Sequence, residues 1–125
     1  WSEDAPGRTR GLLETVDLAE SGTESMVRIR LRRRRISVRP QVWIGRRRVD
    51  LLVGDILVIE CDGAEHHGTW AAQAADREHD RAMTAEGYVV VRLTYRQIVD
   101  DWPNVERDLL AIIRRGGHRR PRRMR

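Results

Sequence analysis

The sequence predicts an α/β fold, in which a mixed β-sheet starts with a hairpin and is flanked by helices. Two short apolar segments, residues 47–53 and 56–61, stand on either side of Gly54-Asp55, which is typical of a β-hairpin. A third apolar segment, residues 88–93, follows a stretch with helical character at residues 70–86. A crossover helix before a strand that is apolar on both faces indicates parallel pairing, so the sheet is expected to be mixed.

The first predicted helix begins at a capping box. Residues 1–20 show no clean periodicity and are predicted to be a lead-in segment. The run Ser21-Gly22-Thr23-Glu24 has the spacing of a capping box, and the helix is expected to continue to about Arg35. The side chains expected to face the core are Met26, Ile29 and Leu31.

The hairpin is preceded by an extended segment, residues 36–44, which Pro40 restricts to a sheet edge or splits in two. Gly45 is expected to form the turn into the hairpin. An odd number of residues in the Gly54-Asp55 turn would pair Asp50 with Glu60, and the hydrophobic pattern favours this register. The face then expected to be apolar carries Val49, Leu51, Val53, Leu57, Ile59 and Cys61, and the opposite face carries Asp50, Glu60 and Asp62.

The second half of the chain alternates helix and strand. Thr69 is expected to cap the helix of residues 70–86, and Gly87 to end it. Thr94 begins a short helical turn, and Asp101-Trp102-Pro103 opens a last helix that Gly116 closes. The predicted domain is therefore residues 21–116, followed by a basic disordered tail at residues 117–125. The tryptophans expected in or beside the core are Trp43, Trp70 and Trp102.

Composition excludes several classes of protein. A chain of 125 residues is long enough for one domain. Its single cysteine, Cys61, excludes an internal disulfide and a cysteine-rich zinc site. Apolar stretches of about six residues are too short to cross a bilayer, and no secretory signal opens the chain. We therefore expect a cytoplasmic protein without a membrane partner. A start at Trp1 also leaves open that this is the C-terminal domain of a longer protein.

The charge pattern indicates a polyanionic partner. All 24 basic residues are arginine, and the net charge is +5. Five of these arginines stand in the last ten residues, and the rest of the chain is neutral. Clusters at residues 32–35 and 46–48 add local basic patches, for which nucleic acid is the natural partner. A solvated, solubilising surface is the alternative interpretation.

Carboxylates inside apolar strands need a compensating partner, because burying a bare charge is costly. Asp50, Glu60 and Asp62 grouped together would repel one another unless a cation bridged them, and Mg²⁺ prefers such oxygen ligands. Pairing with Arg46, Arg48 or Arg77 is the alternative.

His66 and His67 follow the acidic segment, where one of them could act as a general base or a further ligand, or be an inert loop residue. The next helix presents Asp76 and Asp80 on one face, beside Arg77 and Arg81. These residues either orient the site or form a solvent-exposed face.

The ordered set of motifs resembles a known family. The residues that carry the resemblance are Val49-Asp50-Leu51, Ile59-Glu60-Cys61-Asp62-Gly63, His66-His67, Asp76-Arg77, Asp80-Arg81 and Gly87-Tyr88-Val89-Val90-Val91-Arg92. Over about residues 21–115 the chain is similar to an uncharacterised endonuclease-like family related to the very-short-patch mismatch-repair endonuclease, within the PD-(D/E)xK restriction-endonuclease-like superfamily. The resemblance implies a restriction-endonuclease-like core and metal-dependent hydrolysis of DNA phosphodiesters.

The resemblance also assigns roles to residues. It implies that Asp50 and Glu60 are catalytic, metal-binding acids. Glu24 matches an acid that often faces the metal, although it also fits the capping box. His67 matches a histidine near the scissile phosphate, and His66 is its neighbour.

One position departs from the superfamily motif. Asp62 occupies the place of the usual lysine, and the chain has no lysine. Three possibilities follow. His66 or His67 could act as the base while an arginine such as Arg77 stabilises the phosphate. Alternatively, Asp62 could bind a second metal ion, or the protein could have no catalytic activity.

The sequence therefore favours a DNA endonuclease that uses Mg²⁺ or Mn²⁺. The residues expected to contact nucleic acid are Arg46, Arg47, Arg48, Arg119 and Arg120, and those expected behind the site are Arg77 and Asp80. The alternative is a catalytically silent nuclease fold that binds nucleic acid or a regulatory partner. The sequence does not indicate an oligomeric state.

Overall fold

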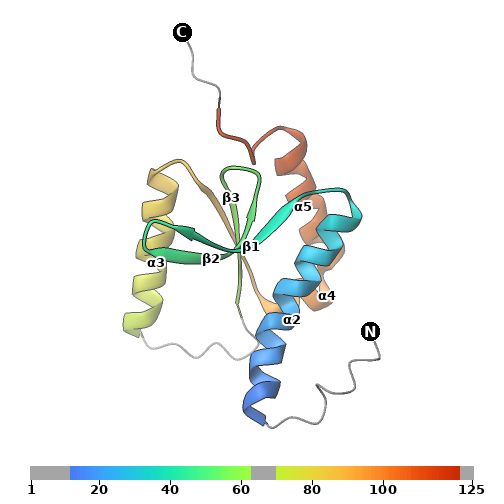
Figure 1. The fold of residues 1–125 in the computed structure, drawn as a ribbon, viewed down its shortest axis with the longest axis vertical. Helices are drawn as coiled ribbons and strands as arrows, with labels where there is room; N and C mark the ends of the chain where they lie inside the picture. Colours follow the sequence, from blue (N-terminus) through green and yellow to red (C-terminus); the bar gives the residue numbers. More distant parts are fainter. Residues whose placement is uncertain (1–11, 63–69, 122–125) are drawn as a thin grey trace.

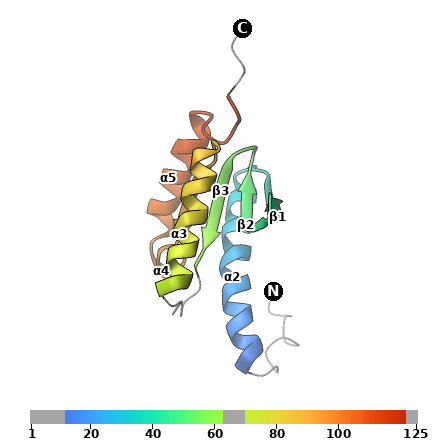
Figure 2. The ribbon, with the colours of Figure 1, turned by 90° about the vertical axis from the view of Figure 1, so that its left-hand side faces the viewer.

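A four-stranded β-sheet forms the middle of three layers in the computed structural model, which describes residues 12–62 and 70–121 (Figure 1). Helices α2, α4 and α5 lie on one side of the sheet and α3 on the other (Figure 1), and α3 is turned toward the viewer in Figure 2. The elements in chain order are α2 (Leu12–Arg33), β1 (Val38–Ile44), β2 (Arg47–Val53), β3 (Leu57–Cys61), α3 (Trp70–Ala85), β4 (Val89–Leu93), α4 (Tyr95–Asp100) and α5 (Trp102–Arg114). This arrangement confirms the predicted α/β class. Within the part of the chain that the structure describes, no helix is long and apolar enough to span a bilayer.

The sheet has the order β1-β2-β3-β4, with β1, β2 and β3 antiparallel and β4 parallel to β3. Strand β1 lies at an edge, where Pro40 is tolerated because its missing N–H would face outward. The turn between β2 and β3 holds three residues, and Leu51 pairs with Ile59. Continued by one step, this register sets Asp50 opposite Glu60, as the hydrophobic pattern predicted.

Both faces of the sheet are buried, and one predicted face assignment is wrong. Leu51 and Val53 pack toward α2, α4 and α5, whereas Val49 packs with Leu52 and Met83 on the α3 side. The change of face coincides with a break in the β1–β2 pairing: Gln41, which has a left-handed φ of 53°, and Asp50 are missing from the register. Side chains before and after such an irregularity face different layers.

Helix α2 differs from the prediction in its start and in its buried face. It begins at Leu12 and runs through Gly22, so the predicted capping box at residues 21–24 does not start it. Glycine inside a helix costs only about 1 kcal/mol, which neighbouring turns can offset. The buried stripe is Thr23, Val27 and Leu31, whereas Ile29 is 40% exposed.

The later elements match the prediction closely. Thr94 and Gln97 form a capping box at the start of α4, and α5 begins at Trp102 with proline in its first turn. The segment after α5 does not match, because residues 117–121 are placed against the β2–β3 turn. The His118 carbonyl accepts hydrogen bonds from the backbone N–H groups of Asp55, at 2.8 Å, and Ile56, at 3.2 Å. The predicted disorder therefore does not begin at residue 117.

Candidate active site

Three carboxylates from three elements converge beside the middle of the sheet. Asp50 and Glu60 come from neighbouring strands, and Glu24 comes from α2. Because Glu24 directly follows Thr23 of the buried stripe, α2 turns this acid toward the sheet. Its side chain hydrogen-bonds that of Asp50, and Gln41 Nε2 donates to Glu24 Oε1 at 2.8 Å.

The environment of these acids favours their neutral forms. Glu60 is 6% exposed, and burial together with the charge of Asp50 raises its pKa to about 7, although Arg47 opposes the shift. Burial, the charge of Asp50 and the hydrogen bond to Asp50 raise the pKa of Glu24 to about 7. Near neutral pH, Glu24 and Glu60 therefore keep their protons in a fraction of the folded molecules.

Backbone contacts hold Asp50 in place. The backbone N–H of Cys61 donates to Asp50 Oδ2 at 2.8 Å, which ties the middle of β2 to the last residue of β3 beside the acids. The Cys61 thiol itself is unsuited to nucleophilic chemistry, because burial and the surrounding acids raise its pKa.

Asp62 lies apart from the other two acids of the predicted cluster. Arg92, the register partner of Glu60 on β4, donates to Asp62 Oδ1 at 2.8 Å and to Asp80 Oδ2 at 2.9 Å. Burial lowers the pKa of Arg92, but the hydrogen bonds with Asp80 and Asp62 outweigh it and the net shift is upward. Glu24 thus takes the place beside Asp50 and Glu60 that the hairpin pattern assigned to Asp62.

Arg47 is the cation at the carboxylates. Its guanidinium lies 3.8 Å from Glu60 and 3.8 Å from Asp76 of α3. The predicted alternative partners Arg46, Arg48 and Arg77 are exposed and make no ion pair with these acids in the described part of the chain.

The exposed edge of β1 carries an aromatic side chain. Trp43 is 64% exposed, so its predicted place in or beside the core is wrong, and the Arg48 guanidinium lies 5.8 Å from its ring centre.

Several predicted site residues lie elsewhere or outside the description. His66 and His67 lie outside the described residues. Arg119 is exposed in the segment after α5. Arg120 donates its backbone N–H to Asp55 Oδ2 at 3.0 Å and places its guanidinium 6.0 Å from the Tyr88 ring centre.

The carboxylates are the kind of ligands that a divalent metal ion binds, but their side chains are not arranged in the geometry of a metal site. Within residues 12–62 and 70–121, no group of three or more His, Cys, Asp or Glu side chains is arranged to hold a metal ion. Glu60 Oε2, however, is buried without a hydrogen-bond partner, and all donors here are carboxylate oxygens, as Mg²⁺ and Mn²⁺ prefer. The residue types therefore fit such an ion, which would displace the protons held by Glu24 and Glu60.

Sequence reasoning missed two residues that organise this site. A charged side chain inside an apolar strand needs a partner, and this argument, used above for Glu60, applies equally to Arg92. Arg92 is the one charged residue in the otherwise apolar strand β4. Nothing in the sequence pattern pointed to Gln41, because its contact with Glu24 is made from a left-handed backbone conformation that the pattern does not reveal.

Comparison with known proteins agrees with this fold. A solved structure described as the homing endonuclease I-Bth0305I catalytic domain superposes with a TM-score of 0.62 and 18% identity, covering 70% of this chain and 89% of that chain. This likeness shows the fold. No curated protein matches the chain at a significant level. The family model REase_MTES_1575 matches residues 24–113, the region that contains all three converging acids, and it supports a nuclease-type function. The chain belongs to this restriction endonuclease-like family.

Proposed function

We propose that the protein is a metal-dependent endodeoxyribonuclease of the PD-(D/E)xK type. One observation carries this proposal: Glu24, Asp50 and Glu60 converge from three elements, with a buried, unpartnered oxygen on Glu60. The membership of the restriction endonuclease-like family supports DNA as the substrate.

The three acids would hold Mg²⁺ or Mn²⁺. A bound ion of this kind activates water and neutralises charge on the phosphate. The protein keeps the acids in place through the Cys61 N–H bond to Asp50 and the Gln41 bond to Glu24. Because the folded chain raises the pKa of Glu24 and of Glu60 to about 7, cleavage should increase with pH as these two protons leave.

Arg47 is our candidate for the charge that the motif lysine usually supplies. It is the cation nearest Glu60, and its 3.8 Å contacts with two carboxylates are too long to use its hydrogen-bonding capacity fully. Arg92 is less suitable, because Asp62 and Asp80 already occupy both ends of its guanidinium. We expect Arg47→Met to lower the cleavage rate about a hundredfold or more, and Arg46→Met, at an exposed neighbouring position, to lower it much less.

The closer relation to the very-short-patch mismatch-repair endonuclease is part of the proposal. It would give His66 or His67 a role near the scissile phosphate, and Asp62 and Asp80 a role in positioning Arg92. Trp43 with Arg46 and Arg48 forms an exposed basic and aromatic edge next to the acids, which suits contact with a DNA strand.

A cleavage assay tests the proposed function. Wild-type protein, Asp50→Asn and the exposed control Asp108→Asn would be incubated with supercoiled plasmid, single-stranded DNA and mismatched duplex, in Mg²⁺, Mn²⁺ or EDTA. We expect metal-dependent cleavage by the wild type and the control, and none by Asp50→Asn. Cleavage that Asp50→Asn retains, or that persists in EDTA, would refute the assignment.

A catalytically silent DNA-binding module is the second candidate. The position two residues after Glu60 holds Asp62, whose carboxylate is engaged by Arg92, and this observation favours it. This candidate predicts that the wild type binds DNA, cleaves none of these substrates, and binds equally well with and without Mg²⁺.

A further inference from the structure

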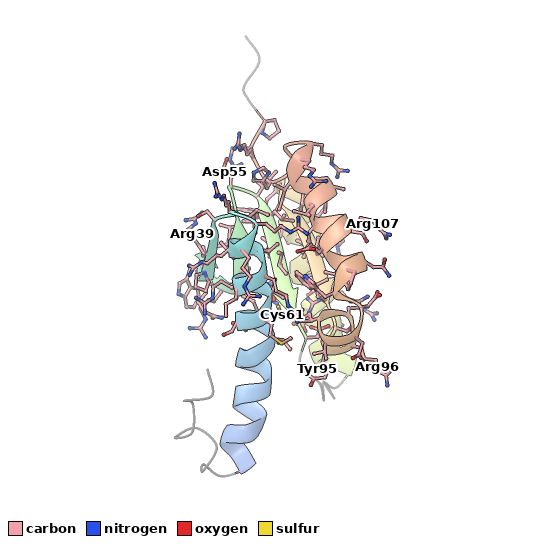
Figure 3. All side chains as sticks on the ribbon, turned by 90° about the vertical axis from the view of Figure 1, so that its right-hand side faces the viewer. Arg39, Asp55, Cys61, Tyr95, Arg96 and Arg107 are labelled. Carbon is pink, nitrogen blue, oxygen red and sulfur yellow. The ribbon has the colours of Figure 1, made fainter. Side chains whose placement is uncertain are left out.

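A basic pocket lies at the end of the molecule away from Cys61. It has a volume of about 550 Å³ and is formed where the ends of α2 and α5 meet the β2–β3 turn. Figure 3 marks this end by Asp55, with Cys61 at the other end of β3. Its lining residues are Arg35, Ile36, Ser37, Val53, Gly54, Ile113, Arg114, Gly116, His118 and Arg119.

The pocket is strongly cationic. Arg35, Arg114 and Arg119 line it, and no aspartate or glutamate does. Among the described residues, none of these three arginines has a carboxylate partner. Other arginines behave differently: Arg34 binds Glu106 at 2.9 Å, and Arg92, at the other end of the sheet, binds two carboxylates. Three unpaired guanidinium groups around one hollow therefore favour an anion there.

The shape of the pocket is fixed by the backbone. Arg35 and Gly116, with φ values of 65° and 78°, turn the chain sharply after α2 and α5. The His118 carbonyl then accepts two backbone hydrogen bonds from the β2–β3 turn. A Cβ at Gly54 would lie 2.4 Å from that carbonyl oxygen, so the two segments approach as closely as only glycine allows.

We propose that this pocket binds a phosphate group of the DNA backbone, at a distance from the carboxylates. This inference rests on the proposed function, because it takes DNA as the ligand. Arginine recognises phosphate oxygens through paired N–H groups, and Ser37 adds a hydroxyl donor. The apolar floor of Ile36, Val53 and Ile113 suits an adjoining sugar.

The spacing suits one continuous strand. Val53 at the pocket lies three residues from Asp50 along β2, which corresponds to about 10 Å. Along α2, Glu24 and Arg33, the last helical residue, are nine residues or about 14 Å apart, and Arg35 follows two residues later. A DNA strand with one phosphate at the carboxylates would thus reach the pocket a few nucleotides away. The pocket would fix the register of the strand without reading its bases.

The test is the salt dependence of DNA binding, measured without metal so that catalysis plays no part. Fluorescence anisotropy of a labelled 20-base-pair duplex would be recorded in EDTA between 50 and 200 mM salt. The pocket variant combines Arg35→Gln and Arg114→Gln. The control variant, Arg96→Gln with Arg107→Gln, has the same net charge and changes two exposed arginines outside the pocket (Figure 3).

We expect the pocket variant to bind the duplex at least tenfold more weakly than the wild type at 100 mM salt. The slope of log K against log salt concentration should be smaller in magnitude by about one, which corresponds to the loss of one phosphate contact. The control variant should change the slope much less. Equal slopes and affinities for the pocket variant and the control would overturn the pocket assignment alone. If the wild type also fails to bind the duplex, the proposed function fails with it.

Discussion

Replacing Glu60 with glutamine should stabilise the protein while abolishing its cleavage of DNA. Glu60 is buried, and its pKa is about 7 in the folded chain against an ordinary value of 4.5. The folded state therefore holds the proton more tightly than the unfolded state, and ionising Glu60 destabilises the fold. Since one pH unit of pKa difference corresponds to about 1.4 kcal/mol, the full effect is about 3 kcal/mol.

The pH window follows from the same values. Below pH 4.5 the Glu60 carboxyl is protonated in both states, so Glu60→Gln should change stability little. Between about pH 4.5 and 7 the free energy of unfolding of the wild type falls, because Glu60 ionises more readily in the unfolded state. Over this range the stability of Glu60→Gln relative to the wild type therefore increases. At pH 8 we expect the variant to be more stable by about 3 kcal/mol, a figure that already includes the opposing attraction of Arg47 because the pKa of about 7 does.

Urea denaturation at pH 5 and pH 8, in EDTA, measures this difference. The control is Glu106→Gln, which removes an ion pair with Arg34 on the surface and should cost at most about 1 kcal/mol. A Glu60→Gln variant that is less stable than the wild type at pH 8, or an advantage that does not grow with pH, would refute the electrostatic reasoning. Added Mg²⁺ should stabilise only the wild type.

Three further changes test the fold. Gly22→Ala should raise stability by about 0.5 to 1 kcal/mol, because α2 continues through Gly22 and the added methyl meets nothing within 4 Å; a lower midpoint in urea would argue against a continuous helix. Gly54→Ala should cost about 1 to 3 kcal/mol by forcing His118 away, and unchanged thermal stability would contradict that contact. Arg92→Met should cost about 2 to 3 kcal/mol by leaving Asp80 without its partner, and a loss below 0.5 kcal/mol would show that this network is unimportant.

The sheet was predictable because its signals are local. The apolar pattern of β2 and β3 and the odd turn between them set the register that places Asp50 opposite Glu60. The position of Pro40 predicted either an edge strand or a split one, and β1 lies at the edge. The face of Val49 was not predictable, because the break in the β1–β2 pairing at Gln41 and Asp50 leaves no trace in the hydrophobic pattern.

The site was predictable only in part, for a related reason. Motif resemblance indicated Asp50, Glu60 and Glu24, which the structure brings together. Arg92 and Asp62 pair through tertiary contact across two strands, and such pairing has no sequence spacing to reveal it. The segment around His118 was predicted to be disordered from its basic composition, yet its backbone hydrogen bonds with the β2–β3 turn order it.

Mn²⁺ binding followed by NMR tests the central claim, that Glu24, Asp50 and Glu60 hold a divalent metal ion. Mn²⁺ would be titrated into ¹⁵N-labelled wild-type protein and into Asp50→Asn, and the paramagnetic loss of amide signals would be mapped. We predict that signals of residues around these acids disappear first in the wild type and persist in the variant. Signal loss centred elsewhere, or equal loss in both proteins, would contradict the claim.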